Sequence, residues 1–239
     1  NKMLNLPDEY KVSGMPNGNQ RIYEGKDIYR WEMRQFAGLD EKGNSLWYMD
    51  RDLTDGEGNV VGVEKVTTGD ATEATQYLLE KSALPDFTGG LNTTLRWKSL
   101  DLTIMTNFQF GGYGYDYDFS AFSSANFPMN RLKNYADAWN PETGKGSAPI
   151  WNTNDSNINA SSDRFLISKT YFNLRNITLG YRVNQKFVRR IGLSAIDVNF
   201  SVNNVCAFSN MRQMLNYDNT WFASFPTARS YVLGLTLTF

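Results

Sequence analysis

The last ten residues, SYVLGLTLTF, alternate between large apolar and mostly small polar side chains, and the sequence stops inside this pattern. A period of two places alternate side chains on opposite faces of a β-strand. One face carries Tyr231, Leu233, Leu235, Leu237 and Phe239. The other face carries Ser230, Gly234, Thr236 and Thr238, with Val232 as its one apolar member. The segment therefore predicts a strand with two very different faces.

The same alternation recurs upstream in four segments, which are 86–97, 99–110, 176–183 and 195–204. Only a short turn at Lys98 separates the first two segments, so we expect them to form an antiparallel hairpin. Their polar faces carry mostly Asn, Thr, Ser, Gln and Gly, whereas the solvent face of a soluble sheet usually carries many Lys and Glu. This composition favours a transmembrane β-barrel with a hydrated lumen. A soluble secreted β-sandwich that binds carbohydrate remains the alternative.

Composition argues against several other classes of protein. The chain has 239 residues and a net charge of −1, so its overall charge does not favour nucleic acid as a partner. It has no histidine and only one cysteine, Cys206, which leaves no internal disulfide and no cysteine zinc site. Asp116 and Asp118 alone do not make a hydrolytic pair. We therefore expect neither an enzyme nor a bound cofactor. No apolar run is long enough for a transmembrane helix.

The connections differ greatly in length. About sixty residues between Gln109 and Phe172 lack clear alternation, and another long loop is expected between 204 and the last strand. Residues 131–139 have helical spacing, and a short helix is expected within 184–192. Short turns on one side and long loops on the other are typical of outer-membrane barrels. In the N-terminal third, the sequence predicts two strands about the turn 40–44, followed by a loop from Arg51 to Ala83.

Aromatic and acidic residues in the long loops are candidates for contact with a substrate or a lid. They are Tyr113, Tyr115, Asp116, Tyr117, Trp139, Trp151, Trp221 and Phe222. Aromatic rings stack on sugars and carboxylates accept hydrogen bonds from hydroxyl groups, but packing within the loops or an interfacial belt explains the same residues. Asp50 and Asp52 faintly resemble a calcium loop; Thr54 breaks that pattern, and a solvated acidic turn is the favoured interpretation. We therefore predict no metal site.

Several motifs occur in an order that resembles the C-terminal part of SusC/RagA family TonB-linked outer-membrane proteins of Bacteroidetes. They are FAGLDEKGNSLWYMD, KSALPDFTGGLNTTLRWKSLDLTIMTNFQFGG, RLKNYADAWNPE, TYFNLRNITLGYRV, LSAIDVNFSVNNV and FPTARSYVLGLTLTF. They extend from about residue 28 to the last residue.

The resemblance implies a multi-pass barrel of 22 strands in the bacterial outer membrane, of which this chain would hold about eight, together with their long extracellular loops. It also implies nutrient import driven through TonB, oligosaccharides or peptides as substrates, and a SusD-like surface lipoprotein as a lid. The apolar row of the last strand would face lipid, and Phe239 would be the terminal aromatic residue that the assembly machinery reads. Residues 1–239 would be the C-terminal portion of the receptor, with the plug and TonB box upstream of Asn1.

Overall fold

The computed structural model describes residues 1–123, 137–151, 155–209 and 228–239. These residues fold into two compact units. The first comprises Asn1–Leu84 and Tyr113–Ile167, and the second comprises Pro85–Gly112 and the described residues from Ser168 onwards. Strands joined in antiparallel sheets dominate both units, which confirms the all-β expectation.

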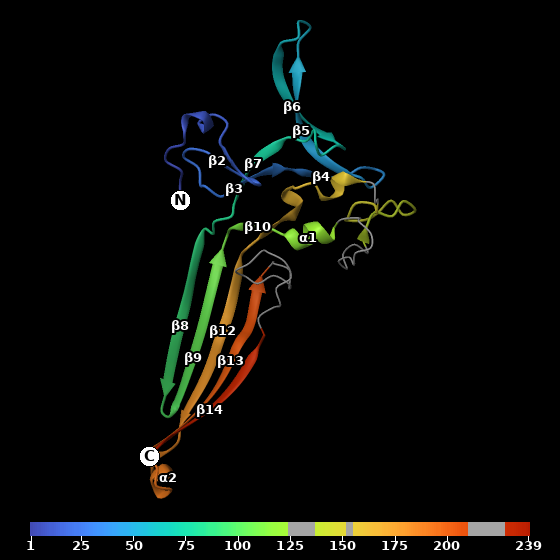
Figure 1. Cartoon of the computed structure of the whole chain (residues 1–239). Coiled ribbons are helices and arrows are strands. Elements are labelled where there is room, and N and C mark those ends of the chain that lie inside the picture. The colour runs from blue at the N-terminus through green and yellow to red at the C-terminus, as the bar shows by residue number, and fades with distance from the viewer. Residues whose placement is uncertain (124–136, 152–154, 210–227) are drawn as a thin grey trace. The chain divides into compact units, whose positions relative to one another are not determined.

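The second unit is a single sheet of five long strands (Figure 1). The strands are β8 (Phe87–Trp97), β9 (Leu100–Phe110), β12 (Tyr171–Arg182), β13 (Ala195–Ser209) and β14 (Ser230–Thr238). Their order in the sheet is β14-β13-β12-β9-β8, and every neighbouring pair is antiparallel. The five alternating segments of the sequence are these five strands. The resemblance implied about eight strands of a barrel; five of the described strands form this sheet, and the other described strands form smaller sheets.

The hairpin of β8 and β9 follows the prediction closely. Trp97 pairs with Leu100, so the loop contains only two residues. Lys98, the first of them, has a φ of 55°, a conformation that glycine adopts with less strain. The hairpin fixes the register of every cross-strand pair between the two strands.

The β12–β13 connection contains the predicted short helix, α2 (Gln185–Arg190). The Asn184 side chain caps it by accepting a hydrogen bond from the Lys186 N–H at 2.9 Å. Val188 is fully buried and anchors the helix. Strand β13 continues to Ser209, so residues 205–209, which the sequence placed in a loop, belong to the sheet. A bulge at Asn204, whose φ is 54°, explains why the alternation is hard to follow there.

The first unit contains three smaller sheets. One has the order β1 (Met15–Asn17), β2 (Gln20–Ile22), β3 (Arg30–Arg34) and β7 (Gln76–Ser82). The second has the order β4 (Phe36–Leu39), β5 (Ser45–Thr54) and β6 (Val60–Thr68), and the third pairs β10 (Tyr113–Tyr115) with β11 (Leu166–Ser168). The helices are α1 (Tyr117–Phe122) and the short 3-10 helices η1 (Asp8–Tyr10), η3 (Ser156–Asn159) and η4 (Asp163–Phe165).

The core of the first unit has two parts. Trp31, Met33, Leu79, Tyr115 and Phe165 form the larger cluster. Trp47, Ala71 and Ala74 form the smaller one. Burial of these apolar side chains contributes to the stability of the first unit.

The loop predicted for Arg51–Ala83 is wrong, because this range contains the end of β5 and all of β6 and β7. Most of the β6 side chains are exposed on both faces of the strand. Because neither face is buried, the sequence does not need to alternate apolar and polar residues there. The predicted helix at 131–139 lies mostly outside the described residues. The predicted pair of strands about the turn 40–44 is confirmed as β4 and β5.

Candidate functional site

The five-stranded sheet sorts its side chains onto an apolar face and a polar face. On β14 the apolar face carries the residues that the sequence assigned to lipid, Tyr231, Leu233, Leu235, Leu237, and beyond the strand Phe239. Cross-strand pairing continues this face through Phe200 and Leu179 to Leu102 and Leu95. These side chains are unusually open for apolar residues, with Leu233 75% and Leu235 64% exposed. Within the described part of this unit, nothing covers the apolar face.

A row of hydroxyl groups crosses the polar face. Thr94, Thr103, Thr178 and Ser201 are direct partners on four successive strands. The hydroxyl oxygens of Thr94 and Thr103 lie 3.1 Å apart, and those of Thr178 and Ser201 lie 2.7 Å apart. The row is neutral and can both donate and accept hydrogen bonds.

A row of amide groups lies beside the hydroxyl row. The Asn176 Nδ2 group donates to Asn203 Oδ1 at 2.8 Å, and Asn203 Nδ2 donates to the Ser230 hydroxyl at 3.0 Å. The Thr178 hydroxyl donates to Asn176 Oδ1 at 2.9 Å and joins the two rows. These contacts fix the orientation of side chains that would otherwise sample many rotamers, which gives the face a defined pattern of donors and acceptors.

Two ion pairs occupy the end of the polar face near the short turns. Arg96 Nε lies 3.2 Å from Asp101 Oδ1, and Arg182 Nε lies 2.7 Å from Asp197 Oδ1. Both pairs are largely exposed, so each contributes little to stability. A hollow of about 380 Å³ lies next to them and is lined by residues from both turns, which are Ser99, Arg182, Val183, Asn184, Gln185, Ser194 and Ala195.

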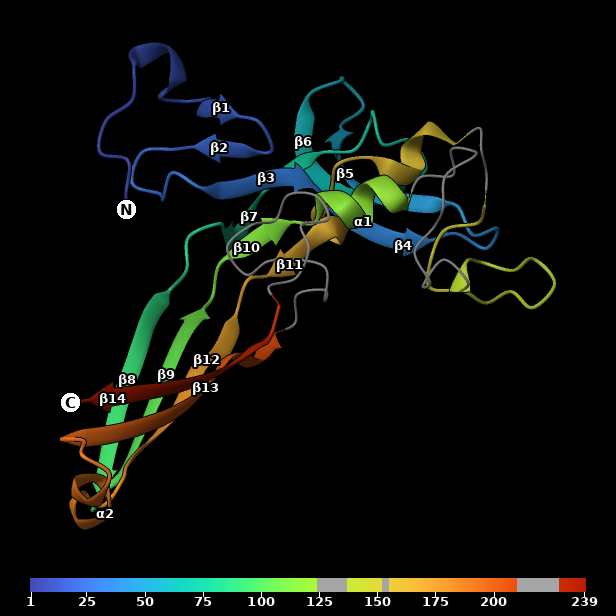
Figure 2. The ribbon, with the colours of Figure 1, turned by 60° about the horizontal axis from the view of Figure 1, so that its bottom comes forward.

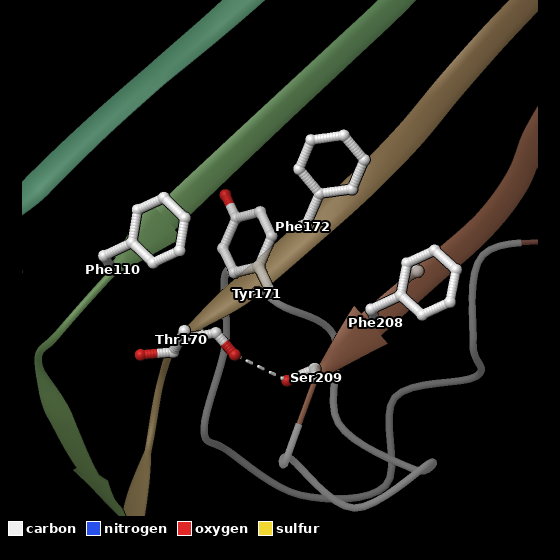
Figure 3. A pocket seen from close by; sticks show the side chains of 7 residues that line it. Phe110, Thr170, Tyr171, Phe172, Phe208 and Ser209 are labelled. Carbon is white, nitrogen blue, oxygen red and sulfur yellow. Dashed lines mark hydrogen bonds between the residues drawn. The ribbon is translucent and has the colours of Figure 1, made fainter.

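A second hollow lies at the opposite end of the sheet and has a volume of about 580 Å³ (Figure 3). Its lining includes Phe110, Phe172 and Phe208 together with the polar groups of Thr170, Tyr171 and Ser209. The Ser209 hydroxyl donates to the Thr170 carbonyl at 3.0 Å and ties the strand ends together. The hollow is open to solvent, and its lining combines aromatic rings with few hydrogen-bonding groups. This composition is typical of a surface that contacts another molecule.

Sequence reasoning did not single out the hydroxyl and amide rows as site residues. Each member was visible as the polar half of an alternating segment, but the segments alone do not show which residues are neighbours. The hairpin turn at Lys98 was the available signal, because a two-residue loop fixes the register. Pairing of the remaining strands required the structure.

The candidate contact residues at 113–117 lie in the first unit, where several of them form part of its packing. Tyr115 is buried, and its ring lies 5.8 Å from that of Phe165 and 4.7 Å from that of Tyr117. Asp116 is buried as the N-cap of α1, where a carboxylate oxygen accepts from the Phe119 N–H at 2.8 Å. Tyr113 is half-buried, and its carbonyl accepts from Trp31 Nε1 at 3.2 Å. Contact with a ligand at these positions stays a prediction.

The two described tryptophan candidates differ in exposure. Trp139 packs over the turn of the β4–β5 hairpin so closely that a Cβ at Gly43 would lie 2.2 Å from its ring. Trp151 is exposed. Trp221 and Phe222 lie outside the described residues. The Ile150 N–H, one residue before Trp151, donates to the Gly43 carbonyl at 2.8 Å, so both described tryptophans lie near the β4–β5 turn. A role of these four aromatic residues in binding stays a prediction.

The weak calcium candidates Asp50 and Asp52 lie in strand β5 and not in a turn. The Tyr77 hydroxyl donates to Asp50 Oδ1 at 2.6 Å. Desolvation and this interaction with Asp50 raise the pKa of Tyr77 to about 12. The turn begins at Asp55, whose carboxylate accepts from the backbone N–H groups of Glu57 and Asn59. Among the described residues, no group of three or more His, Cys, Asp or Glu side chains is placed to hold a metal ion.

None of the helices formed by the described residues is both long and apolar enough to cross a membrane.

No family model matches the chain. Two curated relatives come from Formosa agariphila. TonB-dependent receptor P3 is 23% identical over 273 residues, which cover 100% of this chain and 26% of the relative. TonB-dependent receptor P39 is 26% identical over 171 residues, which cover 66% of this chain and 16% of the relative. The chain thus spans about a quarter or less of the relatives that it matches.

Solved structures of a RagAB peptide transporter share the fold. The match to the structure described as the RagAB peptide transporter has a TM-score of 0.73 and 22% identity, and covers 95% of this chain and 24% of the other. The same importer in its open-open state matches with a TM-score of 0.72 and 21% identity over 94% of this chain and 24% of the other. At this level of identity the match establishes the fold alone.

The sequence relatives and the structural neighbours agree with each other and with the ordered motifs of the sequence. The matched proteins are named as receptors and transporters, so at the level of class they fit the expectation of a protein that is not an enzyme. The resemblance to SusC/RagA proteins is therefore confirmed at the level of similarity: the chain is similar in sequence to proteins named TonB-dependent receptors and in fold to the RagAB peptide transporter.

Proposed function

We propose that the chain is the C-terminal part of the barrel wall of an importer that carries nutrients across the outer membrane. The observation that carries the proposal is the five-stranded sheet with an uncovered apolar face and a hydrogen-bonded polar face. The apolar face suits contact with lipid, and the polar face suits a hydrated passage. The relatives named TonB-dependent receptors support a transport role for the complete protein.

The edges of the sheet support the view that this wall continues in the rest of the receptor. Among the described strands, β8 and β14 each pair on one side only. An unpaired strand edge is costly inside a bilayer, where water does not satisfy backbone N–H and C=O groups. Since the chain spans about a quarter of its relatives, the remaining strands and the plug would come from the rest of the polypeptide.

The polar face suggests which interactions the barrel wall makes with a substrate during transport. Its hydroxyl and amide rows offer neutral donors and acceptors, and its two Arg–Asp pairs neutralise each other. Such a surface forms many weak contacts without trapping a charged group. Oligosaccharides or peptides are the substrates that we propose, with energy supplied by TonB through the plug and with a SusD-like lipoprotein as the lid. The wall itself performs no catalysis.

A soluble carbohydrate-binding β-sandwich is the alternative. A sandwich buries the apolar face of one sheet against a second sheet, whereas here Leu233 and Leu235 are exposed within their own unit. The similarity in fold to RagAB also favours the barrel.

Purification and growth test the function of the complete receptor. Membranes are extracted in detergent, and the polypeptides that purify with the receptor are identified by mass spectrometry. We expect a plug-bearing receptor together with a surface lipoprotein. Cells that lack the receptor should fail to grow on one class of oligosaccharide or peptide and should recover with the intact gene. Recovery of the receptor as a monodisperse monomer without detergent, or unchanged growth on every substrate tested, would contradict the proposal.

A further inference from the structure

Unpaired cations gather at the short-turn end of the five-stranded sheet. Lys98 lies in the β8–β9 turn, and Lys186, Arg189 and Arg190 lie in α2. None of the four forms an ion pair with a carboxylate among the described residues. The connection 183–196 contains no Asp or Glu at all. Both turns lie at the same end of the sheet in Figures 1 and 2, and their residues line one hollow.

The local charge differs sharply from that of the whole chain. The four unpaired cations add to the two Arg–Asp pairs, so the six cationic and two acidic side chains carry a charge of +4. The α-carboxylate of Phe239, which follows the Ala195–Thr238 pair at this end, lowers the local charge to +3. The complete chain has a charge of −1. Clustered positive charge of this kind attracts an anionic partner.

Exposed apolar side chains accompany the cations on α2. Phe187 is 58% and Ile191 is 55% exposed, although both are large and apolar. They are four residues apart and therefore lie on one side of the helical turn. Lys186 and Arg190 have the same spacing and form a cationic pair beside them. A short element that presents apolar groups next to Lys and Arg suits the boundary between acyl chains and headgroups.

The side chains along the sheet occur in the order that a lipid leaflet presents. Leu95 and Leu102 belong to the apolar face, exposed Trp97 and Tyr181 follow towards the turns, and Lys98 and the α2 cations come last. Trp and Tyr favour the interface, and Lys and Arg reach beyond it towards phosphate groups. Lys98 Nζ lies 4.8 Å from the centre of the Trp97 ring. A soluble acidic partner would explain the cations, but it would not explain why apolar, aromatic and cationic side chains follow one another in this order along the sheet.

We propose that α2 and the β8–β9 turn form a docking surface for the headgroups of anionic phospholipids. Lys98, Lys186, Arg189 and Arg190 contact the phosphate groups, while Phe187 and Ile191 enter the acyl boundary. This proposal rests on the membrane-spanning role of the sheet. It adds a preference for a lipid of stated charge, located at the short-turn side of the barrel.

The test uses the full-length receptor, purified in detergent and analysed by native mass spectrometry with phosphatidylglycerol or phosphatidylcholine. The wild-type receptor should retain phosphatidylglycerol in preference. The triple variant Lys186→Gln, Arg189→Gln, Arg190→Gln should bind it about 100-fold more weakly, since each cation near the headgroups contributes about a fivefold effect. A control variant removes three exposed cations of the first unit, Lys2→Gln, Lys42→Gln and Lys145→Gln. It should bind phosphatidylglycerol like the wild type.

A second variant separates the apolar contribution from the charge. Phe187→Ser keeps every cation and should lower the retention of phosphatidylglycerol, while inorganic phosphate at equal concentration should not displace the lipid from the wild type. Equal binding of the two lipids, equal binding by the triple variant, or displacement by inorganic phosphate would overturn the proposal. Each result counts against the lipid site alone if the receptor remains folded in the outer membrane. If the receptor is not in the membrane, the barrel-wall proposal itself fails.

Discussion

Leu235 and Thr236 are neighbours in β14, but they belong to opposite faces of the sheet. Leu235 is 64% exposed on the apolar face, and Thr236 pairs with Asp197 on the polar face. We expect Leu235→Arg to lower the free energy of unfolding in lipid vesicles by about 2–4 kcal/mol, because a charge near the bilayer midplane is costly. Thr236→Arg is the matched control and should change it by less than about 0.5 kcal/mol. Similar effects at both positions would contradict the assignment of faces.

Asp40 and Asp55 hold two turns of the same design. In each turn, the carboxylate accepts from the backbone and the side chain of the Asn four residues later. Partial desolvation raises the pKa of Asp40, but hydrogen bonds from Asn44 and Lys42 outweigh it and lower the pKa below 3.8. Hydrogen bonds from Asn59 lower the pKa of Asp55 in the same way.

The lowered pKa values predict acid-sensitive turns. A carboxylate whose pKa is lower in the folded state stabilises the fold above its unfolded pKa of about 3.9, and this stabilisation is lost as the pH falls through the folded value. Hydrogen exchange at residues 40–44 and 55–59, corrected for the intrinsic rate, should therefore show less protection at pH 3 than at pH 7. The turn at Lys98 and Ser99, which contains no carboxylate, is the internal control. Equal protection at both pH values would contradict the prediction.

At the scale of the element, the turn of the β8–β9 hairpin contains a strained residue whose cost in free energy of unfolding is measurable. Lys98 has a φ of 55°, where a side chain is strained and glycine is not. Lys98→Gly should raise the free energy of unfolding by up to about 1 kcal/mol, measured by urea unfolding of the full receptor in vesicles. Ser99→Gly is the control, because Ser99 does not have a positive φ, and it should stabilise nothing. A destabilised Lys98→Gly variant would show that the lysine side chain contributes more than the turn strain costs.

Elements were predictable from the sequence where the two faces of a strand meet different surroundings. Strands β8, β9 and β14 show a clear alternation and were predicted within one residue at each end. Strand β12 was predicted to begin at residue 176, five residues after its first residue, because the register shifts between Leu174 and Asn176. Strand β6 was missed because its exposed faces impose no alternation. The sequence DGEGN at 55–59 repeats the turn pattern of DEKGN at 40–44, and this repetition was the signal for the β5–β6 hairpin. The turn residues at 55–59 therefore predict the β5–β6 hairpin, which the periodicity of apolar residues does not.

The candidate site was less predictable than the fold. Tyr115 and Asp116 were chosen for their chemistry, but the structure uses them for a core and a helix cap. An aromatic residue in a long loop gives no sign of its burial, because packing depends on contacts far apart in the sequence, such as that between Tyr115 and Phe165. The exposed apolar row on β14 was visible because it follows from periodicity alone.

At the scale of the whole molecule, we predict that Phe239 acts in assembly of the receptor and contributes little to the stability of the folded barrel. Phe239 is 89% exposed and follows the last strand residue, Thr238. Deletion of Phe239 should reduce the amount of receptor in the outer membrane, while the barrel that does assemble should unfold at nearly the wild-type temperature. Phe239→Tyr keeps an aromatic terminus and should assemble normally. Normal surface levels after deletion would count against an assembly signal.

The central claim is that the five-stranded sheet forms a membrane wall with lipid on one face and water on the other. Spin labels placed singly at positions 231–238 of the full receptor, in a Cys206→Ser background and in native outer membranes, test it most directly. Collision with dissolved oxygen should be high at 231, 233, 235 and 237, and collision with a water-soluble nickel chelate should be high at 232, 234, 236 and 238. This alternation with a period of two is the predicted result. Equal access of the nickel chelate at all eight positions would contradict the claim.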